Sequence, residues 1–113
     1  MERRTIRRRH LMFHLRVFDA ETGEQLGLLS DISSAGLRLT GERHLPIDRT
    51  YRLQMRMPPA IANGRRFEFP ATVAWIEDDQ LTEFCDIGFR DMALEEDQRR
   101  ALERLIDTFE LRD

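Results

Sequence analysis

The sequence contains no lysine, so all 18 of its basic side chains are arginine. It has one cysteine, Cys85, which excludes an internal disulfide and agrees with a reducing compartment. No apolar run approaches the roughly 20 residues that a membrane-spanning helix needs. The charged start of the chain is not followed by the apolar segment of a secretory signal. These absences favour a cytoplasmic protein without a membrane span.

The sequence also lacks a pattern typical of catalysis. The carboxylates at 77–79 and 95–97 fit a solvated turn and a helix start, and no base or nucleophile accompanies them. Cys85 has no basic cluster near it in sequence, so we expect a small packed apolar residue rather than a nucleophile. We therefore expect no enzyme activity.

The three histidines do not form a metal-binding pattern. His10 and His14 would point the same way on a strand but lie about 13 Å apart, too far to share one ion. His44 falls in a predicted loop without a partner. We expect neither a metal ion nor a cofactor.

Charge is distributed unevenly along a chain of one domain's length. Of the 113 residues, 41% are hydrophobic and 35% are charged, which is typical of a folded globular domain. The net charge is only −3, yet residues 1–10 carry five arginines against one glutamate. Residues 77–113 carry thirteen acidic residues against five arginines, a composition that repels nucleic acid.

Alternating apolar and polar residues predict strands along most of the chain. Gly23 is placed for a hairpin turn, and Pro70 suggests an edge position or a bulge. The predicted strands cover 11–19, 26–32, 36–40, 51–57, 67–75 and 84–90. Short strands at turn-marked spacing, with no internal repeat and no linker, favour a small antiparallel barrel.

From Leu94 the apolar period changes to that of an amphipathic helix. We expect its stripe to pack on the barrel, and a partner-binding or dimer face is the alternative; the stripe consists of Leu94, Leu102, Leu105, Ile106 and Phe109. Trp75 continues the alternation of Phe69 and Val73, which favours a core or barrel-mouth position. A place beside a ligand is the alternative for Trp75, because its strand ends there.

Two short segments carry distinctive chemistry. Residues 3–9 hold five arginines, whose guanidinium groups can form forked hydrogen bonds to phosphate or to the O6/N7 edge of guanine. Asp31-Ile32-Ser33-Ser34-Ala35-Gly36 combines an acceptor, a hydroxyl and a glycine that permits close backbone approach. Taken alone, the arginine segment fits a solvated tail and the segment from Asp31 to Gly36 fits an ordinary turn. Together, across one hairpin, they indicate an anion-binding site.

In this order the two segments resemble the PilZ domain family, whose hallmark is RxxxR followed by (D/N)xSxxG. Arg4-Thr5-Ile6-Arg7-Arg8 matches the first element, and the segment from Asp31 to Gly36 matches the second. Further likeness lies in Gly36-Leu37-Arg38-Leu39, Ala74-Trp75 and Ile87-Gly88-Phe89. The resemblance covers essentially the whole chain. It implies a mostly β fold: one domain over 1–113, with a flexible arm (1–10), a six-stranded antiparallel β-barrel (11–91) and a C-terminal α-helix (93–111).

The register of the first element has one alternative. Arg3 and Arg7 have the same spacing as Arg4 and Arg8. We prefer the second pair, because Arg8 then stands at the family's usual distance from Val17.

The resemblance implies binding of cyclic di-GMP, a bacterial second messenger with two guanines and two phosphodiesters. The implied ligand-binding residues are Arg4, Arg8, Arg9, Asp31, Ser33 and Gly36, and further candidates are Arg3, Arg7, Arg38 and Trp75. We expect the arginine arm to become ordered over the nucleotide. The output is then expected to pass to an unidentified protein in motility, polysaccharide production or chemotaxis.

Two other functions remain open. A small barrel could use the arginine arm on RNA or single-stranded DNA, which requires exposed aromatics on a basic strand face. The aromatics of this chain follow the core pattern instead, so we regard nucleic acid as a poor candidate. The third alternative is a PilZ-like adaptor that no longer needs the nucleotide.

Overall fold

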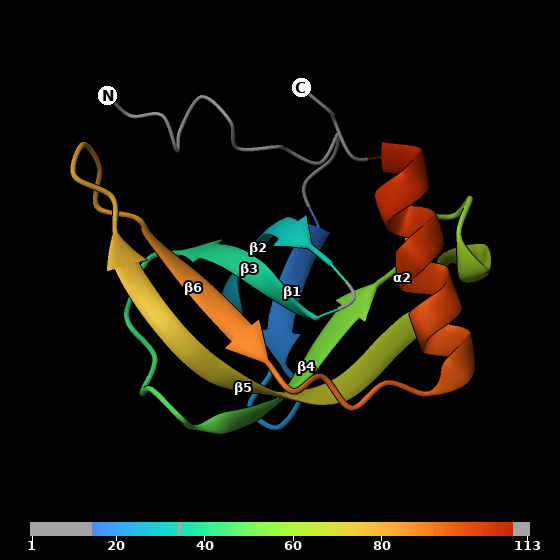
Figure 1. Ribbon diagram of the computed structural model, residues 1–113, viewed down its shortest axis with the longest axis horizontal. Helices are drawn as coiled ribbons and strands as arrows, with labels where there is room; N and C mark the ends of the chain where they lie inside the picture. Colours follow the sequence, from blue (N-terminus) through green and yellow to red (C-terminus); the bar gives the residue numbers. More distant parts are fainter. Residues whose placement is uncertain (1–14, 34, 110–113) are drawn as a thin grey trace.

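The computed structural model describes residues 15–33 and 35–109. The strands within these ranges are β1 (Leu15–Asp19), β2 (Gln25–Ile32), β3 (Gly36–Gly41), β4 (Thr50–Arg56), β5 (Arg66–Asp78) and β6 (Cys85–Arg90). A short 3-10 helix, η1 (Ala62–Gly64), precedes β5, and the α-helix α2 (Glu96–Phe109) follows β6 (Figure 1). Each strand overlaps a predicted one. However, β5 continues past Trp75, the expected end of that strand, to Asp78, so Glu77 and Asp78 pair with β6 and are not part of the expected turn. The expected residues 11–14 of the first strand and 110–111 of the helix lie outside the described ranges.

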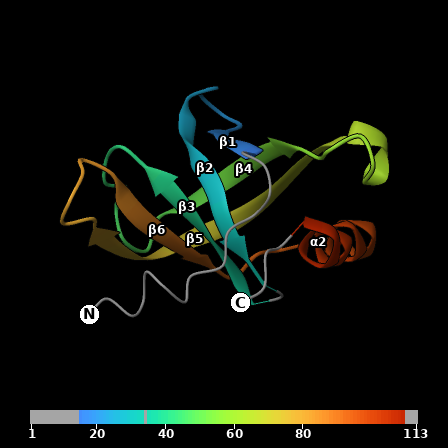
Figure 2. The ribbon, with the colours of Figure 1, turned by 90° about the horizontal axis from the view of Figure 1, so that it is seen from above.

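The six strands form one closed barrel in the order β1-β2-β3-β6-β5-β4 (Figure 2). Every neighbouring pair is antiparallel, and closure comes from the pairing of β1 with β4. The helix α2 lies beside the barrel, near the end of β4 (Figure 1). The predicted antiparallel barrel with one C-terminal helix is confirmed.

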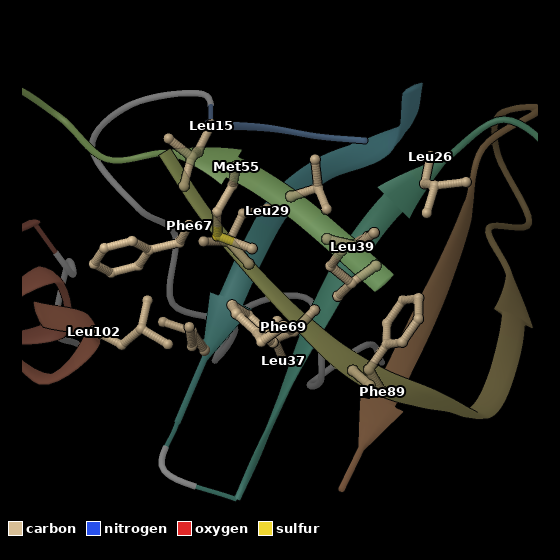
Figure 3. Packing of buried hydrophobic residues seen from close by; sticks show 14 of the residues in the cluster. Leu15, Leu26, Leu29, Leu37, Leu39, Met55, Phe67, Phe69, Phe89 and Leu102 are labelled. Atoms are coloured by element: carbon tan, nitrogen blue, oxygen red, sulfur yellow. The ribbon is translucent and has the colours of Figure 1, made fainter. Parts of the chain in front are cut away.

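The core fills the barrel and continues under α2. Inward-facing residues alternate strictly along β1, β3 and β4, as in Tyr51, Leu53 and Met55 of β4, whereas the residues between them are half-buried or exposed. Side chains from several strands meet inside, as Figure 3 shows for Leu29, Leu39 and Phe69. Burial of this apolar surface is the main contribution that stabilises the fold.

A β-bulge in β5 interrupts the alternation of that strand. Val73 pairs with Phe89 and Trp75 pairs with Gly88, so Ala74 is the extra residue. Because one extra residue reverses the faces of the strand, Trp75 turns outward and its side chain is 43% exposed, whereas Val73 is fully buried. The core position favoured for Trp75 by the sequence pattern is therefore wrong.

Pro70 occupies the half of β5 that has only one strand neighbour. It pairs with Arg52 of β4, and the ladder between β5 and β6 begins only at Thr72. The missing N–H of proline is tolerated at such a locally open edge. The Pro70 carbonyl accepts a hydrogen bond from the Ala93 N–H at 3.1 Å, which holds the connection before α2 against the strand. The expected edge position is confirmed.

The helix begins at Glu96, three residues after the expected position 93. The Gln98 side chain accepts a hydrogen bond from the Glu95 N–H at 2.9 Å and donates one to the Glu68 carbonyl at 3.1 Å. The first bond caps the helix start and the second ties it to β5. Leu102 and Leu105 are buried, so these two residues of the apolar stripe pack on the barrel. Among the described residues, no helix is long and apolar enough to cross a membrane.

Two leucine-to-alanine substitutions test this distribution of burial. Leu39 in β3 is fully buried, and Leu39→Ala should lower the free energy of unfolding by about 2–5 kcal/mol because it leaves a cavity. Leu81, in the turn between β5 and β6, is 93% exposed, and Leu81→Ala should change it by less than about 0.5 kcal/mol. Urea unfolding measures both values. Equal losses would contradict the described core.

Candidate functional site

The turn between β2 and β3 is built by the side chain of Ser33. The Ser33 N–H donates to the Gly36 carbonyl at 2.9 Å, and the Ser33 hydroxyl accepts from the Ala35 N–H at 3.2 Å. The same hydroxyl donates to the Gly36 carbonyl at 3.4 Å. Ser33 is exposed, so its oxygen shapes the turn and still borders solvent.

Gly36 is required by the close approach of β3 to β6. A Cβ at this position would lie 2.3 Å from the Phe89 carbonyl oxygen, a backbone atom that cannot move aside alone. The residue pairs with Arg90 in the ladder. Only glycine therefore allows the turn to join β3 at this place.

Asp31 and Arg38 form an ion pair on the outer face of the barrel. Arg38 Nη2 lies 3.5 Å from Asp31 Oδ2, and the two residues are directly opposed in the β2–β3 ladder. A bulge at Ser30 sets this register, and the Ser30 hydroxyl donates to the Arg38 carbonyl at 3.1 Å. The Asp31 side chain remains 32% exposed, so the carboxylate can still accept hydrogen bonds from a ligand.

The indole of Trp75 packs directly against Gly88. A Cβ at Gly88 would lie 2.1 Å from Trp75 Cε2 and 2.3 Å from Trp75 Nε1, so the indole occupies the space that a side chain would fill. Gly88 is opposed to Arg38 on one side and to Trp75 on the other. Asp31, Arg38, Gly88 and Trp75 thus form one row across β2, β3, β6 and β5.

This row borders a pocket of about 500 Å³ on the outside of the barrel. The volume is within the range of small-molecule sites. The pocket is lined by Asp31, Ile32, Ser33, Ala35, Gly36, Leu37, Arg38, Ala74, Trp75, Phe89 and Arg90. It combines a carboxylate acceptor, a hydroxyl, two guanidinium groups and an aromatic ring. Such a set suits an anionic ligand that also carries a flat polar ring.

Comparison with known proteins agrees with this geometry. A family model described as PilZ domain matches residues 2–108. The chain belongs to the PilZ domain family. This family comprises receptors for cyclic di-GMP, which are binding and adaptor domains rather than enzymes. No curated protein matches the chain.

A solved structure of the Bacillus subtilis inhibitor of motility (MotI/DgrA) is similar to this PilZ domain. The TM-score is 0.66 at 20% sequence identity. The match covers 88% of this chain and 48% of that protein, so the chain spans about half of its length. At this identity the likeness shows the fold alone.

The structure brings together the part of the predicted PilZ site that it describes. Asp31, Ser33, Gly36, Arg38 and Trp75 all line the pocket. The predicted arginines precede residue 15 and lie outside the described ranges; they are Arg3, Arg4, Arg7, Arg8 and Arg9. The role of each of these residues toward a ligand stays a prediction.

Arg90 is a pocket residue that the sequence analysis missed. It reaches the pocket because β6 pairs with β3, and this register cannot be read from local sequence. Its guanidinium donates hydrogen bonds to Asp48 at 2.8 Å and to Asp91. These bonds raise the pKa of Arg90 above its ordinary value, so the side chain stays charged.

The predictions for two residues outside the pocket, His44 and Cys85, have different outcomes. His44 has a partner, contrary to expectation, because its Nε2 lies 2.6 Å from Asp78 Oδ1. Cys85 is buried, as expected for a packed residue, and its thiol donates to the Arg43 carbonyl at 3.6 Å. Burial raises the pKa of Cys85, and the Asp78 and Asp86 carboxylates raise it further.

Substitution of Gly88 should displace the indole. Gly88→Ala places a methyl group within 2.6 Å of three ring atoms of Trp75, so the ring must turn toward solvent. Trp75 is the only tryptophan, and its fluorescence emission should shift to longer wavelength. Gly23→Asn is the control, since Gly23 has a φ of +79°, which asparagine tolerates, and open space around it. Unchanged emission in Gly88→Ala would contradict the stacking of Trp75 on Gly88.

Proposed function

We propose that this PilZ domain binds cyclic di-GMP in the pocket beside Asp31 and Trp75 and passes the signal to a protein partner. The observation that carries the proposal is the cross-strand row from Asp31 to Trp75. It presents an acceptor, a cation and an aromatic face along one wall of a pocket.

The acceptor end of the row suits a guanine edge. Guanine offers its N1–H and its exocyclic amine as neighbouring donors, and an ionised carboxylate accepts hydrogen bonds only. The Asp31 carboxylate stands next to the Ser33 turn, whose hydroxyl adds an exposed polar atom. A guanine bound here would satisfy both of its donors against Asp31.

The aromatic end suits the face of a base. Trp75 exposes 43% of its surface, although an indole normally avoids water. The ring packs against Gly88, and this contact fixes the position of the indole on the barrel surface. Stacking of a base on an aromatic side chain contributes about 1–3 kcal/mol.

The ligand's phosphodiesters require cations, which Arg38, Arg90 and the N-terminal arginines can supply. Leu15, the first residue of β1, pairs with Leu29, two residues before Asp31. The chain before Leu15 therefore joins the barrel at the pocket end of β2. Arg8 precedes Leu15 by seven positions, and an extended chain of about 3.3–3.6 Å per residue covers up to about 25 Å over that length. Arg8 can thus reach the pocket.

In this proposal, the signal to the protein partner arises when the arginine-rich segment, residues 3–9, becomes ordered on the bound nucleotide. Ordering this segment over the dianionic nucleotide costs conformational entropy and gains charge-assisted hydrogen bonds. Nucleotide binding and ordering of the segment are therefore coupled. The ordered segment then presents a new surface to a protein partner. The similar Bacillus subtilis protein is an inhibitor of motility, and motility is accordingly one process in which to seek the partner.

Isothermal titration with cyclic di-GMP tests the binding. The folded protein should bind the nucleotide, and the stoichiometry should distinguish one bound nucleotide from two. Arg8→Ala and Asp31→Ala should each weaken binding by about tenfold or more, about 1.4 kcal/mol, because each removes a charge-assisted contact.

Matched control substitutions distinguish the loss of a specific contact with the nucleotide from the loss of a charge elsewhere on the protein. Arg99→Ala and Glu103→Ala remove the same charges from exposed positions on α2 and should leave the affinity unchanged. Arg7→Ala tests the register and should weaken binding less than Arg8→Ala. Absence of heat with folded protein would refute the proposal. Steep salt dependence with generic oligonucleotides would favour nucleic-acid binding instead.

Trp75 should contribute by stacking. Trp75→Ala should weaken cyclic di-GMP binding by about 5-fold or more, whereas Trp75→Phe should keep most of the affinity, because a smaller aromatic face remains. Titration measures both affinities, and circular dichroism verifies that both variants fold. Wild-type affinity in Trp75→Ala would contradict the proposed role of the indole.

A further inference from the structure

The base of the hairpin between β5 and β6 places a carboxylate beside a thiol. Asp78 and Cys85 are directly opposed in the ladder, and the Asp79 N–H donates to the Phe84 carbonyl at 3.0 Å. Directly opposed residues of an antiparallel pair project to the same face of the sheet. The two side chains are therefore held next to each other by backbone hydrogen bonds.

A histidine from a third element completes the cluster. His44 lies in the loop between β3 and β4, and its Nε2 is 2.6 Å from Asp78 Oδ1. Its neighbours anchor this loop: the Arg43 carbonyl accepts from the Cys85 thiol, Arg43 pairs with Glu24, and Leu45 is buried. The imidazole is thus positioned by the fold rather than by the hydrogen bond to Asp78 alone.

We propose that His44, Asp78 and Cys85 bind a zinc ion. One donor atom from each side chain lies within 4.8 Å of the other two. In a tetrahedral site with bonds of about 2.0–2.3 Å, neighbouring donors are roughly 3.3–3.5 Å apart. The side chains of His44 and Asp78 are 61% and 70% exposed, so small rotations about their own bonds can bring the donors to this spacing.

The donor set selects the kind of cation. Thiolate and imidazole are ligands for borderline metals such as Zn²⁺, whereas Mg²⁺ and Ca²⁺ prefer oxygen donors only. On binding, the Cys85 thiol gives up its hydrogen bond to the Arg43 carbonyl, releases its proton to solvent and ligates the ion as a thiolate. The ion replaces the hydrogen bond between His44 and Asp78, and His44 ligates through a ring nitrogen that carries no proton while the other ring nitrogen keeps the N–H. Three protein ligands leave the fourth tetrahedral position for water or for a donor from another molecule.

The site is separate from the nucleotide pocket, since none of its residues lines that pocket. It would join the β3–β4 loop to the base of the β5–β6 hairpin, two segments far apart in sequence. A ligand that binds only the folded state stabilises that state by mass action. Zinc should accordingly raise the melting temperature.

Cobalt substitution provides the direct test. Co²⁺ added to tag-free protein after removal of metals should bind with one ion per chain and give a sulfur-to-cobalt charge-transfer band. Cys85→Ser should abolish the band, and His44→Gln should weaken binding by at least tenfold. His14→Gln is the matched control and should bind as the wild type does. Zinc should displace the cobalt and should raise the melting temperature of the wild type more than that of His44→Gln.

Several results would overturn the proposal. They are the absence of cobalt binding, a band that survives in Cys85→Ser, and unchanged affinity in His44→Gln. His44 is exposed, so its variant keeps the test valid even if Cys85→Ser does not fold. Loss of cobalt binding in His14→Gln would instead assign the metal to the N-terminal histidines. Cyclic di-GMP titration of the same variants separates this outcome from the proposed nucleotide function, because neither depends on the other.

Discussion

The structure depends on the pairing of β5 with two different partners. Its first half pairs with β4 and its second half with β6, and this double pairing joins the two sides of the barrel. A strand that serves two neighbours in succession must bend, and the extra residue at Ala74 supplies the bend where the ladder with β6 is established. The same residue reverses the faces of the strand and brings the indole of Trp75 outside. The bend of β5 and the aromatic wall of the pocket therefore have one cause.

The motif residues have structural and chemical roles at once. Ser33 shapes the turn with its own oxygen, and Gly36 is the residue that permits β3 to approach β6. These positions resist substitution for reasons of backbone geometry, whether or not a ligand is bound. Asp31 and Trp75 differ, because neither is needed to form the turn and both remain accessible. Substitutions at Asp31 and Trp75 are consequently the more informative about binding.

Much of the fold could be predicted from the sequence because apolar residues alternate clearly in most strands. The position of the turn from Asp31 to Gly36 could also be predicted, since aspartate, serine and glycine favour turns. The outward face of Trp75 could not, because a bulge shifts the alternation without any local signal in β5. Arg90 and His44 were missed for a related reason. Each acquires its surroundings through strand pairing between residues far apart in the chain, as for His44 and Asp78, which are 34 residues apart.

Closure of the barrel also restricts how this domain can meet another protein. Within the described ranges every strand has a neighbour on both sides, and the locally open stretch of β5 carries Pro70, whose carbonyl already accepts from Ala93. An incoming peptide thus finds no free row of backbone donors and acceptors on these strands to which it could add as a further strand. The same property protects the domain from edge-to-edge aggregation. On the described strands, recognition by a partner therefore falls to side chains and turns, whose residues can change while the backbone of the barrel stays the same.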